Sequence, residues 1–323
     1  MKAIHHILAT TALVFGLVGP APAQSVKDEQ GIRIAFQKSS PHFAVLKQKG
    51  ILEKRFGKVT WLEFPAGPQL LEAVSVGGAD FAIVGDSPPI FAQAAGKDLL
   101  YVGVEPPKPD AAAILLPKGS SIRNIADLKG KRIAFQKGSS SHYLVVKTLE
   151  SAGLQYADIN PAYLPPAEAR AAFERGDVDA WAVWDPYYAA AVVHGVARVL
   201  TTGRDQNVNN NTFYLSSRSF AEKHQVKILA LLEELNKIDA FLHEQRSEAI
   251  KLYAAFSGLE PDVVGLLLEH RPRAKIRPLS EVEIQSQQHL ADTYARLNLI
   301  PRPIKVADIV WQPNVATARV AAQ

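Results

Sequence analysis

The hexapeptide Arg-Ile-Ala-Phe-Gln-Lys stands at residues 33–38 and again at residues 132–137, 99 positions further along the chain. The same offset relates further pairs of identical residues: Gly77 and Gly176, Asp80 and Asp179, Val84 and Val183, Asp86 and Asp185, and Gly96 and Gly195. One register held without a gap over more than 60 residues indicates a duplicated unit. A period of 99 residues is too long for a solenoid repeat, so the pattern predicts two related lobes.

Each copy shows the same succession of apolar runs and helical segments. In the first copy we expect strands at 32–36, 59–64 and 80–84 and helices at 43–56 and 68–76. In the second copy we expect strands at 132–135, 162–164 and 179–183 and helices at 143–152 and 167–175. This alternation is typical of a parallel sheet covered by helices, so each lobe is predicted to be α/β.

Two polar segments predict crossovers between the lobes. Residues 105–110 are rich in proline, and residues 206–212 contain four asparagines and precede a short strand at 213–215. The remainder predicts helices at about 220–245, 246–256, 261–269 and 281–297, with capping-box patterns at Ser219-x-x-Glu222 and Ser280-x-x-Glu283. We therefore expect lobe I at 24–106 and 213–323 and lobe II at 107–212. Two lobes joined by two crossovers form a hinged cleft suited to closing around a ligand.

Composition excludes several classes of function. The 323 residues are 47% hydrophobic and 21% charged, which is ordinary for a globular protein. The net charge of +4 is scattered, so no nucleic-acid partner is expected. The chain has no cysteine and no His-Glu-x-x-His pair, which removes disulfides, thiolate metal sites and cysteine nucleophiles. Nucleophile-elbow, dinucleotide-binding and P-loop patterns are also missing, so we expect neither an enzyme nor a cofactor or metal.

The amino-terminal 23 residues have the pattern of a secretory signal peptide. Lys2 precedes a run of about 12 mostly apolar residues, and Ala21-Pro22-Ala23 fits a small-x-small cleavage site. The run is short for a spanning helix, which needs about 20 residues. We expect a mature chain beginning near Gln24 and exported to the periplasm or beyond it.

The ends of the predicted strands indicate where a ligand binds. Ligands of open parallel sheets lie beyond the carboxyl ends of the strands, where helix amino termini offer free N–H groups and partial positive charge. Both copies place Gln-Lys followed by small polar residues there, at 37–40 and 136–139, and Ser87 begins a third helix. The pattern predicts an oxyanion held mainly by neutral donors. Capping serines are common without any ligand, so each of them has a purely structural alternative.

Five long motifs resemble the aliphatic sulfonate-binding proteins, the periplasmic receptors of bacterial ABC importers. They are F-P-A-G-P-Q-L-L-E-A at 64–73, G-D-S-P-P-I-F-A-Q-A-A-G at 85–96, A-F-Q-K-G-S-S-S-H at 134–142, Y-L-P-P-A-E-A-R-A-A-F at 163–173 and D-A-W-A-V-W-D-P-Y-Y at 179–188. The likeness extends from about residue 31 to Trp311-Gln312-Pro313. It implies a two-lobed type II periplasmic binding protein fold with two crossover segments, holding a sulfonate group between the lobes.

The resemblance also implies a set of ligand-binding residues. These are Gln37, Ser39, Gly85, Asp86, Ser87, Ser139, Ser140, His142, Trp184 and Asp185. This chain departs from the family pattern in two places. It has Ser39 where the family has a glycine, and its segment 207–212 is unusually rich in asparagine. Both departures affect which sulfonate fits the site. Whether Lys38 or Lys137 assists the anion is left open.

We therefore expect a monomeric periplasmic receptor that binds an aliphatic sulfonate for sulfur uptake and delivers it to an ABC permease in the inner membrane. Within the binding class, the alternatives are receptors for taurine, nitrate or a sulfate ester. A taurine ammonium requires a carboxylate facing the pocket, for which Asp86 and Asp185 are the candidates. An enzyme of the same fold, a desulfinase or a decarboxylase, is disfavoured, because the desulfinase chemistry employs a cysteine and this chain has none. A sensor without transport is a further alternative.

Overall fold

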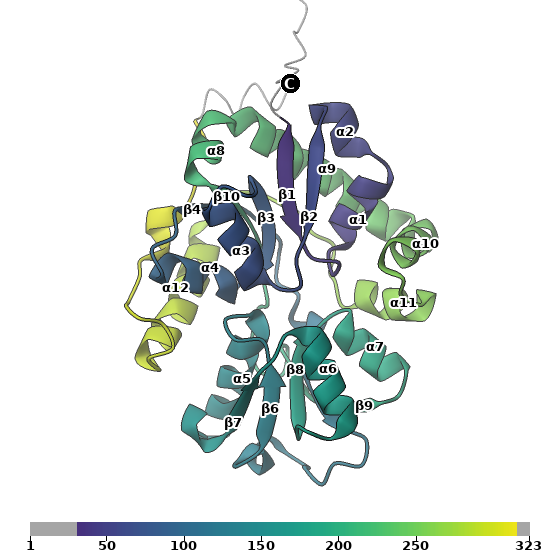
Figure 1. The fold of residues 1–323 in the computed structure, drawn as a ribbon, viewed down its shortest axis with the longest axis vertical. Coiled ribbons are helices and arrows are strands. Elements are labelled where there is room, and N and C mark those ends of the chain that lie inside the picture. The colour runs from purple at the N-terminus through teal and green to yellow at the C-terminus, as the bar shows by residue number, and fades with distance from the viewer. Residues whose placement is uncertain (1–30, 315–323) are drawn as a thin grey trace, which may run out of the picture.

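Two five-stranded sheets, one above the other in Figure 1, organise the chain. The computed structural model describes residues 31–314. Sheet A has the strand order β2 (Val59–Glu63), β1 (Ile32–Phe36), β3 (Phe81–Gly85), β10 (Thr212–Ser217), β4 (Leu99–Val104). Sheet B has the order β7 (Asn160–Tyr163), β6 (Arg132–Phe135), β8 (Ala180–Trp184), β5 (Ala112–Pro117), β9 (Ala197–Thr202). We call sheet A with its helices lobe I and sheet B with its helices lobe II.

The helices follow the strands of each lobe. Those of the first copy are α1 (Pro41–Gln48), α2 (Ile51–Phe56), α3 (Gly67–Ser75) and α4 (Ser87–Ala94). Those of the second are α5 (Ser140–Ser151), α6 (Pro166–Arg175) and α7 (Tyr187–Val193). The carboxy-terminal helices are α8 (Arg218–Lys223), α9 (Gln225–Glu244), α10 (Arg246–Ser257), α11 (Pro261–Glu269) and α12 (Glu281–Arg296). Short 3-10 turns lie at Pro109–Ala111, Ile125–Leu128, Tyr156–Asp158 and Val306–Ile309.

The duplication seen in the sequence is also a duplication of structure. In each sheet the first three strands of the copy run parallel, and a strand from the other end of a crossover inserts antiparallel between the last two. The backbone N–H of Arg33 donates to Asp80 Oδ2 at 2.8 Å, and that of Arg132 donates to Asp179 Oδ2 at 2.7 Å, 99 positions later. The two-lobed α/β fold with two crossovers is confirmed.

The structure departs from the predicted elements at identifiable residues. Strands β4, β5 and β9 were not predicted, and the inserted strands β5 and β10 make each sheet mixed rather than wholly parallel. The helix predicted at 43–56 is broken at Gly50, which has a left-handed φ of 58°. The helix predicted at 220–245 is interrupted at His224. The capping box at Ser280 is confirmed, whereas the one at Ser219 is wrong because α8 begins at Arg218, capped by Ser217.

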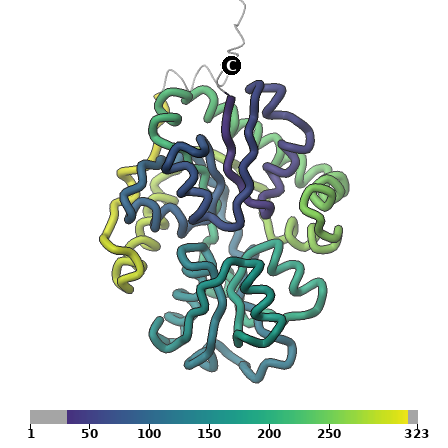
Figure 2. Tube along the Cα trace, viewed as in Figure 1, coloured from purple at the N-terminus to yellow at the C-terminus, as the bar shows by residue number. Residues whose placement is uncertain are grey.

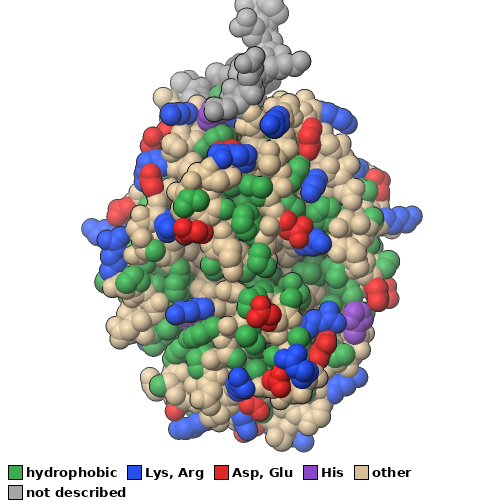
Figure 3. Space-filling model, viewed as in Figure 1, with side chains coloured by type: hydrophobic (Ala, Val, Ile, Leu, Met, Phe, Trp, Pro, Cys, Tyr) green, Lys and Arg blue, Asp and Glu red, His purple; other side chains and the backbone are tan. Residues whose placement is uncertain are grey.

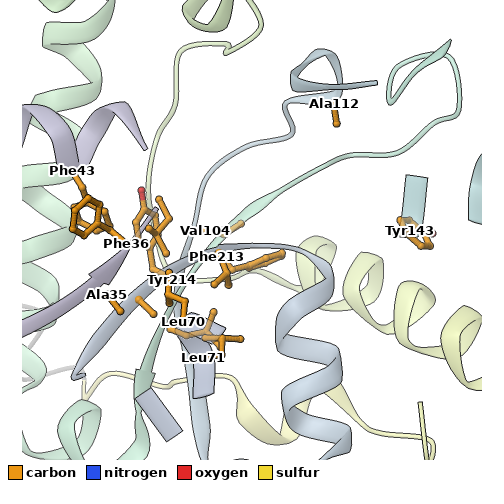
Figure 4. Packing of buried hydrophobic residues seen from close by; sticks show 14 of the residues in the cluster. Ala35, Phe36, Phe43, Leu70, Leu71, Val104, Ala112, Tyr143, Phe213 and Tyr214 are labelled. Carbon is orange, nitrogen blue, oxygen red and sulfur yellow. The ribbon is translucent and has the colours of Figure 1, made fainter. Parts of the chain in front are cut away.

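The core of lobe I lies between sheet A and the helices that cover it. Figure 4 shows Phe43 of α1 pointing toward Phe36 and the strands behind it. Phe43 is fully buried and meets Phe81 and Tyr214 edge-on, with ring centroids 6.4 and 6.3 Å apart. Burying one such ring contributes about 1.5–3 kcal/mol, so this aromatic cluster holds α1 and its amino terminus firmly against the sheet.

The lobes touch at two junctions on either side of the waist seen in Figure 2. At one junction α12 meets α5, where Arg296 Nη2 donates to Glu150 Oε1 at 2.7 Å. At the other, His270 beyond α11 stacks on Tyr188 of α7, with centroids 4.8 Å apart and planes 8° apart. Figure 3 shows hydrophobic side chains along this waist. The two lobes therefore contact each other at both junctions. The predicted signal peptide, residues 1–23, lies outside the described residues.

Candidate functional site

A cavity of about 70 Å³ lies between the lobes. A cavity needs roughly 10–15 Å³ to hold one water, so this one accommodates a headgroup of several heavy atoms. Its lining comes from both lobes and both crossovers: Gln37, Ser39, Ser40, Gly67, Ile83, Val84, Gly85, Pro88, Lys108, Ala111, Ser139, Ser140, Trp184, Asp185, Asn210, Thr212 and Arg271. Aliphatic and aromatic side chains therefore share the wall with hydroxyl, amide and cationic groups.

Helix starts at the carboxyl ends of strands position the small polar residues. Helix α1 begins after β1 and helix α5 after β6, with Ser40 and Ser139 as their N-cap residues. Both caps have extended backbone, and neither side chain bonds the first turn of its own helix. Among the described residues, the buried Ser40 Oγ is without a hydrogen-bond partner, which is costly unless a ligand satisfies it.

The structure brings seven of the ten predicted site residues to this cavity. They are Gln37, Ser39, Gly85, Ser139, Ser140, Trp184 and Asp185. Asp86, Ser87 and His142 lie behind the lining. Lys38 and Lys137 also lie outside it: Lys38 Nζ is 3.8 Å from Glu63 Oε1, and Lys137 Nζ lies 5.3 Å from the centre of the Tyr163 ring.

Asp86 and Ser87 brace the start of α4 from behind. Ser87 Oγ donates to Asp86 Oδ1 at 3.1 Å and accepts from Tyr294 at 2.9 Å. Gln287 Nε2 donates to the backbone oxygen of Asp86 at 2.8 Å. Both side chains are buried, and burial raises the pKa of Asp86. These contacts hold α4, and with it Gly85 and Pro88, at the cavity wall.

His142 sits in an aromatic cluster at the junction of the lobes. Its ring stacks on Phe135 with centroids 5.1 Å apart and lies 5.4 Å from the Tyr294 ring of lobe I. The N–H of Gly138 donates to Nδ1 at 3.3 Å, which leaves Nε2 to donate to Tyr156 Oη at 2.9 Å. Burial, assisted by the charge of Lys137, lowers the pKa of His142 to about 3, so its ring is neutral at physiological pH.

The cavity contains two cations that sequence reasoning missed. Lys108 lies in the first crossover and Arg271 directly after His270, and both side chains are almost wholly buried. Lys108 Nζ hydrogen-bonds Thr212 Oγ1, and Arg271 Nη2 donates to the backbone oxygen of Ser39 at 3.2 Å. Arg271 Nε is buried without a partner among residues 31–314. The cavity lining therefore combines the neutral donors expected from the sequence with two positive charges that were not expected.

Their sequence context explains why they were missed. Lys108 stands between prolines, a pattern that indicates only a crossover, and Arg271 follows a helix that carries no recognisable motif. The one feature of the sequence that could have indicated them is a basic residue in a segment that joins the lobes. The asparagine-rich segment contributes Asn210, whose positive φ of 49° suits asparagine, and Thr212.

Asp185 is the one carboxylate in the lining, and both of its oxygens are engaged. Oδ1 accepts from the backbone N–H of Ala189 at 3.0 Å, and Oδ2 lies 2.7 Å from His270 Nδ1 of lobe I. Burial raises the pKa of Asp185, and its contact with His270 opposes that effect. The pair spans the cleft, and each carboxylate oxygen already has one partner within the protein.

Two further features of residues 31–314 concern membrane-spanning helices and metal sites. Across residues 31–314, none of the helices combines the length and the apolar character that crossing a bilayer requires. In the same range, no three acidic or histidine side chains gather closely enough to hold a metal ion.

The chain is similar to one protein family and to several binding proteins. Residues 28–256 match the NMT1-like family. The alkanesulfonate-binding protein SsuA of Xanthomonas axonopodis pv. citri, solved bound to MOPS, is 49% identical, with a TM-score of 0.85 over 87% of this chain and 98% of that one. The periplasmic aliphatic sulphonate binding protein SsuA of Escherichia coli is 48% identical, with a TM-score of 0.81 over 88% and 98%. The taurine-binding periplasmic protein of Escherichia coli (strain K12) is 26% identical over 73% of this chain and 76% of that protein.

Proposed function

Since this chain belongs to the NMT1-like family, and within it to the aliphatic sulfonate-binding proteins, we propose that it captures aliphatic sulfonates between its lobes as the substrate-binding component of an ABC importer. It is a binding protein and not an enzyme, as its close relatives are. The observation that carries the proposal is the interlobe cavity, where Lys108 and Arg271 meet unpartnered or small polar donors from both lobes.

The cavity matches the chemistry of a sulfonate. Charge-assisted hydrogen bonds from Arg271 and Lys108 and neutral ones from the serine hydroxyls suit three oxygens sharing one negative charge. Ile83, Pro88 and Trp184 provide apolar surface for an uncharged tail. Because the ligand contacts both lobes, binding favours the closed arrangement over an open one.

Taurine remains the second candidate because one relative is a taurine-binding protein. Its ammonium group would need a carboxylate acceptor. Asp185 already accepts from Ala189 and contacts His270, and Asp86 lies behind the lining, so an ammonium on the tail finds no carboxylate that is free of other partners. We therefore expect simple alkanesulfonates to bind more tightly than taurine.

We further propose that the mature chain is a periplasmic monomer that hands its ligand to an inner-membrane permease. Support comes from the signal-peptide pattern at residues 1–23 and from the periplasmic relative in Escherichia coli. The assignment of 24–106 and 213–323 to lobe I and of 107–212 to lobe II belongs to the same proposal.

Calorimetry tests the function directly. The mature protein is titrated with C2 to C8 alkanesulfonates, taurine, nitrate and sulfate, and saturable binding of at least one alkanesulfonate is expected. An Arg271→Gln variant should bind about 10- to 100-fold more weakly, because a hydrogen bond to a charged group contributes about 1.5–3 kcal/mol. Arg246→Gln is the matched control, since Arg246 bonds Gly265 and Glu269 away from the cavity. Absence of binding to every alkanesulfonate would refute the proposal.

A further inference from the structure

Behind the two cavity cations lies one carboxylate that does not itself line the cavity. Glu105, only 3% exposed, directly follows β4, where the first crossover begins. Its Oε2 lies 3.8 Å from Lys108 Nζ and 3.6 Å from Arg271 Nη1. A single carboxylate oxygen thus lies within 4 Å of both cations, and Glu105 is not part of the cavity lining.

Glu105 is held in place by further contacts. Tyr214 of β10 donates its hydroxyl to Oε1 at 2.6 Å, and Asn211 donates to the backbone oxygen of Glu105 at 3.1 Å. His42 Nδ1 lies 3.9 Å from Oε1, while His42 Nε2 lies 3.2 Å from Asp239. The carboxylate therefore cannot swing toward the cavity without losing buried partners.

The charge of Glu105 is permanent at physiological pH. Burial alone would raise its pKa, but electrostatic attraction to Lys108, His42 and Arg271 and the Tyr214 hydrogen bond together lower it to about 2. Lys108 responds in the opposite sense: burial lowers its pKa to about 8, while Glu105 opposes that fall. The three groups form one electrostatic unit, in which one negative charge offsets one of two positive charges.

We propose that Glu105 is a specificity-determining residue, which positions Lys108 and Arg271 and cancels one of their two charges so that the cavity prefers a monoanionic headgroup to a dianionic one. The proposal rests on the proposed function and deepens it. A sulfonate carries one negative charge and sulfate carries two, although both present oxygens on a tetrahedral sulfur. Without the charge of Glu105, the positive charges of Lys108 and Arg271 would both attract the ligand. The second negative charge of sulfate would then be stabilised more strongly than in the native cavity.

The test is the ratio of the dissociation constants of sulfate and butanesulfonate, measured by calorimetry at constant ionic strength and at pH 6, well below the pKa of Lys108, because loss of Glu105 lowers that pKa further. Glu105→Gln keeps an acceptor for Tyr214 and removes the charge. We expect the ratio to fall roughly tenfold in favour of sulfate, which is about 1.4 kcal/mol. Glu63→Gln is the matched control, because it changes the net charge equally but faces the exposed Lys38 outside the cavity. Its ratio should stay within twofold of the wild type.

A second variant tests whether the change in charge causes the effect of the first. In Glu105→Gln/Lys108→Met the balance of one uncompensated cation is restored, so a ratio close to that of the wild type is expected. An unchanged ratio in folded Glu105→Gln, or a ratio displaced tenfold toward sulfate in the double variant, would overturn the proposal. If the wild type bound no alkanesulfonate at all, the proposed function itself would fail. If the wild type bound an alkanesulfonate and Glu105→Gln left the ratio unchanged, only this inference would be refuted.

Discussion

Replacing Gly85 with alanine should hinder closure of the lobes while leaving each lobe intact. Gly85 ends β3 in lobe I, and the residue that approaches it is Ser140 at the start of α5 in lobe II. A Cβ added at Gly85 would lie 2.0 Å from Ser140 Oγ and 3.4 Å from Ser140 Cβ. Contacts to a Cβ below 3.0 Å are essentially never seen, so the hydroxyl must move by about 1 Å or the lobes must stay apart.

The size of the effect follows from where the clash occurs. Overpacking of this kind costs about 1–3 kcal/mol, and here the cost arises only when the lobes are closed. A ligand that requires closure must overcome it, so its affinity should fall about 5- to 150-fold.

The assay is butanesulfonate calorimetry on four proteins: wild type, Gly85→Ala, Ser140→Ala and the double variant. Ser140→Ala removes the clashing hydroxyl and leaves an ordinary contact at 3.4 Å. Gly85→Ala should therefore be damaging in the wild-type background and nearly neutral in the Ser140→Ala background, which is the coupling that a double-mutant cycle measures. Equal losses in both backgrounds, or no loss in either, would refute the reasoning.

Three further predictions concern pH and stability. Sulfonate affinity should fall, by up to tenfold per pH unit, as pH rises above about 8, because burial lowers the pKa of Lys108 to that value; calorimetry should show a flat profile in Lys108→Met. The pKa of His142 is lowered to about 3 by burial, so the stability it contributes is complete above pH 6.5 and declines as pH falls toward 3; urea unfolding at pH 7 and 5 should show a smaller decline in His142→Gln. Phe43→Ala should lower the free energy of unfolding by about 3–5 kcal/mol in urea titrations, and a loss below 1 kcal/mol would contradict the packing described for that ring.

Most of the fold could be predicted because the sequence repeats itself. A repeated strand–helix pattern predicts the same local structure twice, and strands β1, β3, β6 and β8 lie at or within one residue of the predicted ranges. Strands β4, β5 and β9 escaped because short apolar runs beside crossovers do not reveal which sheet they join. The break at Gly50 escaped because the apolar pattern continues across it, and only its left-handed backbone ends the helix.

Site residues that directly follow the predicted strands could be predicted, whereas those that reach the cavity from distant segments could not. Ser39, Ser139 and Gly85 stand at strand ends, which the parallel-sheet rule points to directly. Arg271 reaches the cavity from a segment more than 180 residues after Gly85, and no local pattern connects them. Ser87 and His142 stand beside cavity residues in sequence, yet their side chains turn into the lobes, a choice made by packing partners distant in the chain.

The place of β10 between β3 and β4 has a consequence for biogenesis. Every strand of sheet B lies within residues 112–202, whereas sheet A lacks a central strand until Thr212–Ser217 is available. During synthesis from the amino terminus, lobe II can thus fold while sheet A of lobe I still lacks the strand between β3 and β4. Lobe I is thus the first lobe to be synthesised and the last to complete its sheet. A chain truncated before residue 212 would keep all the strands of sheet B but not those of sheet A.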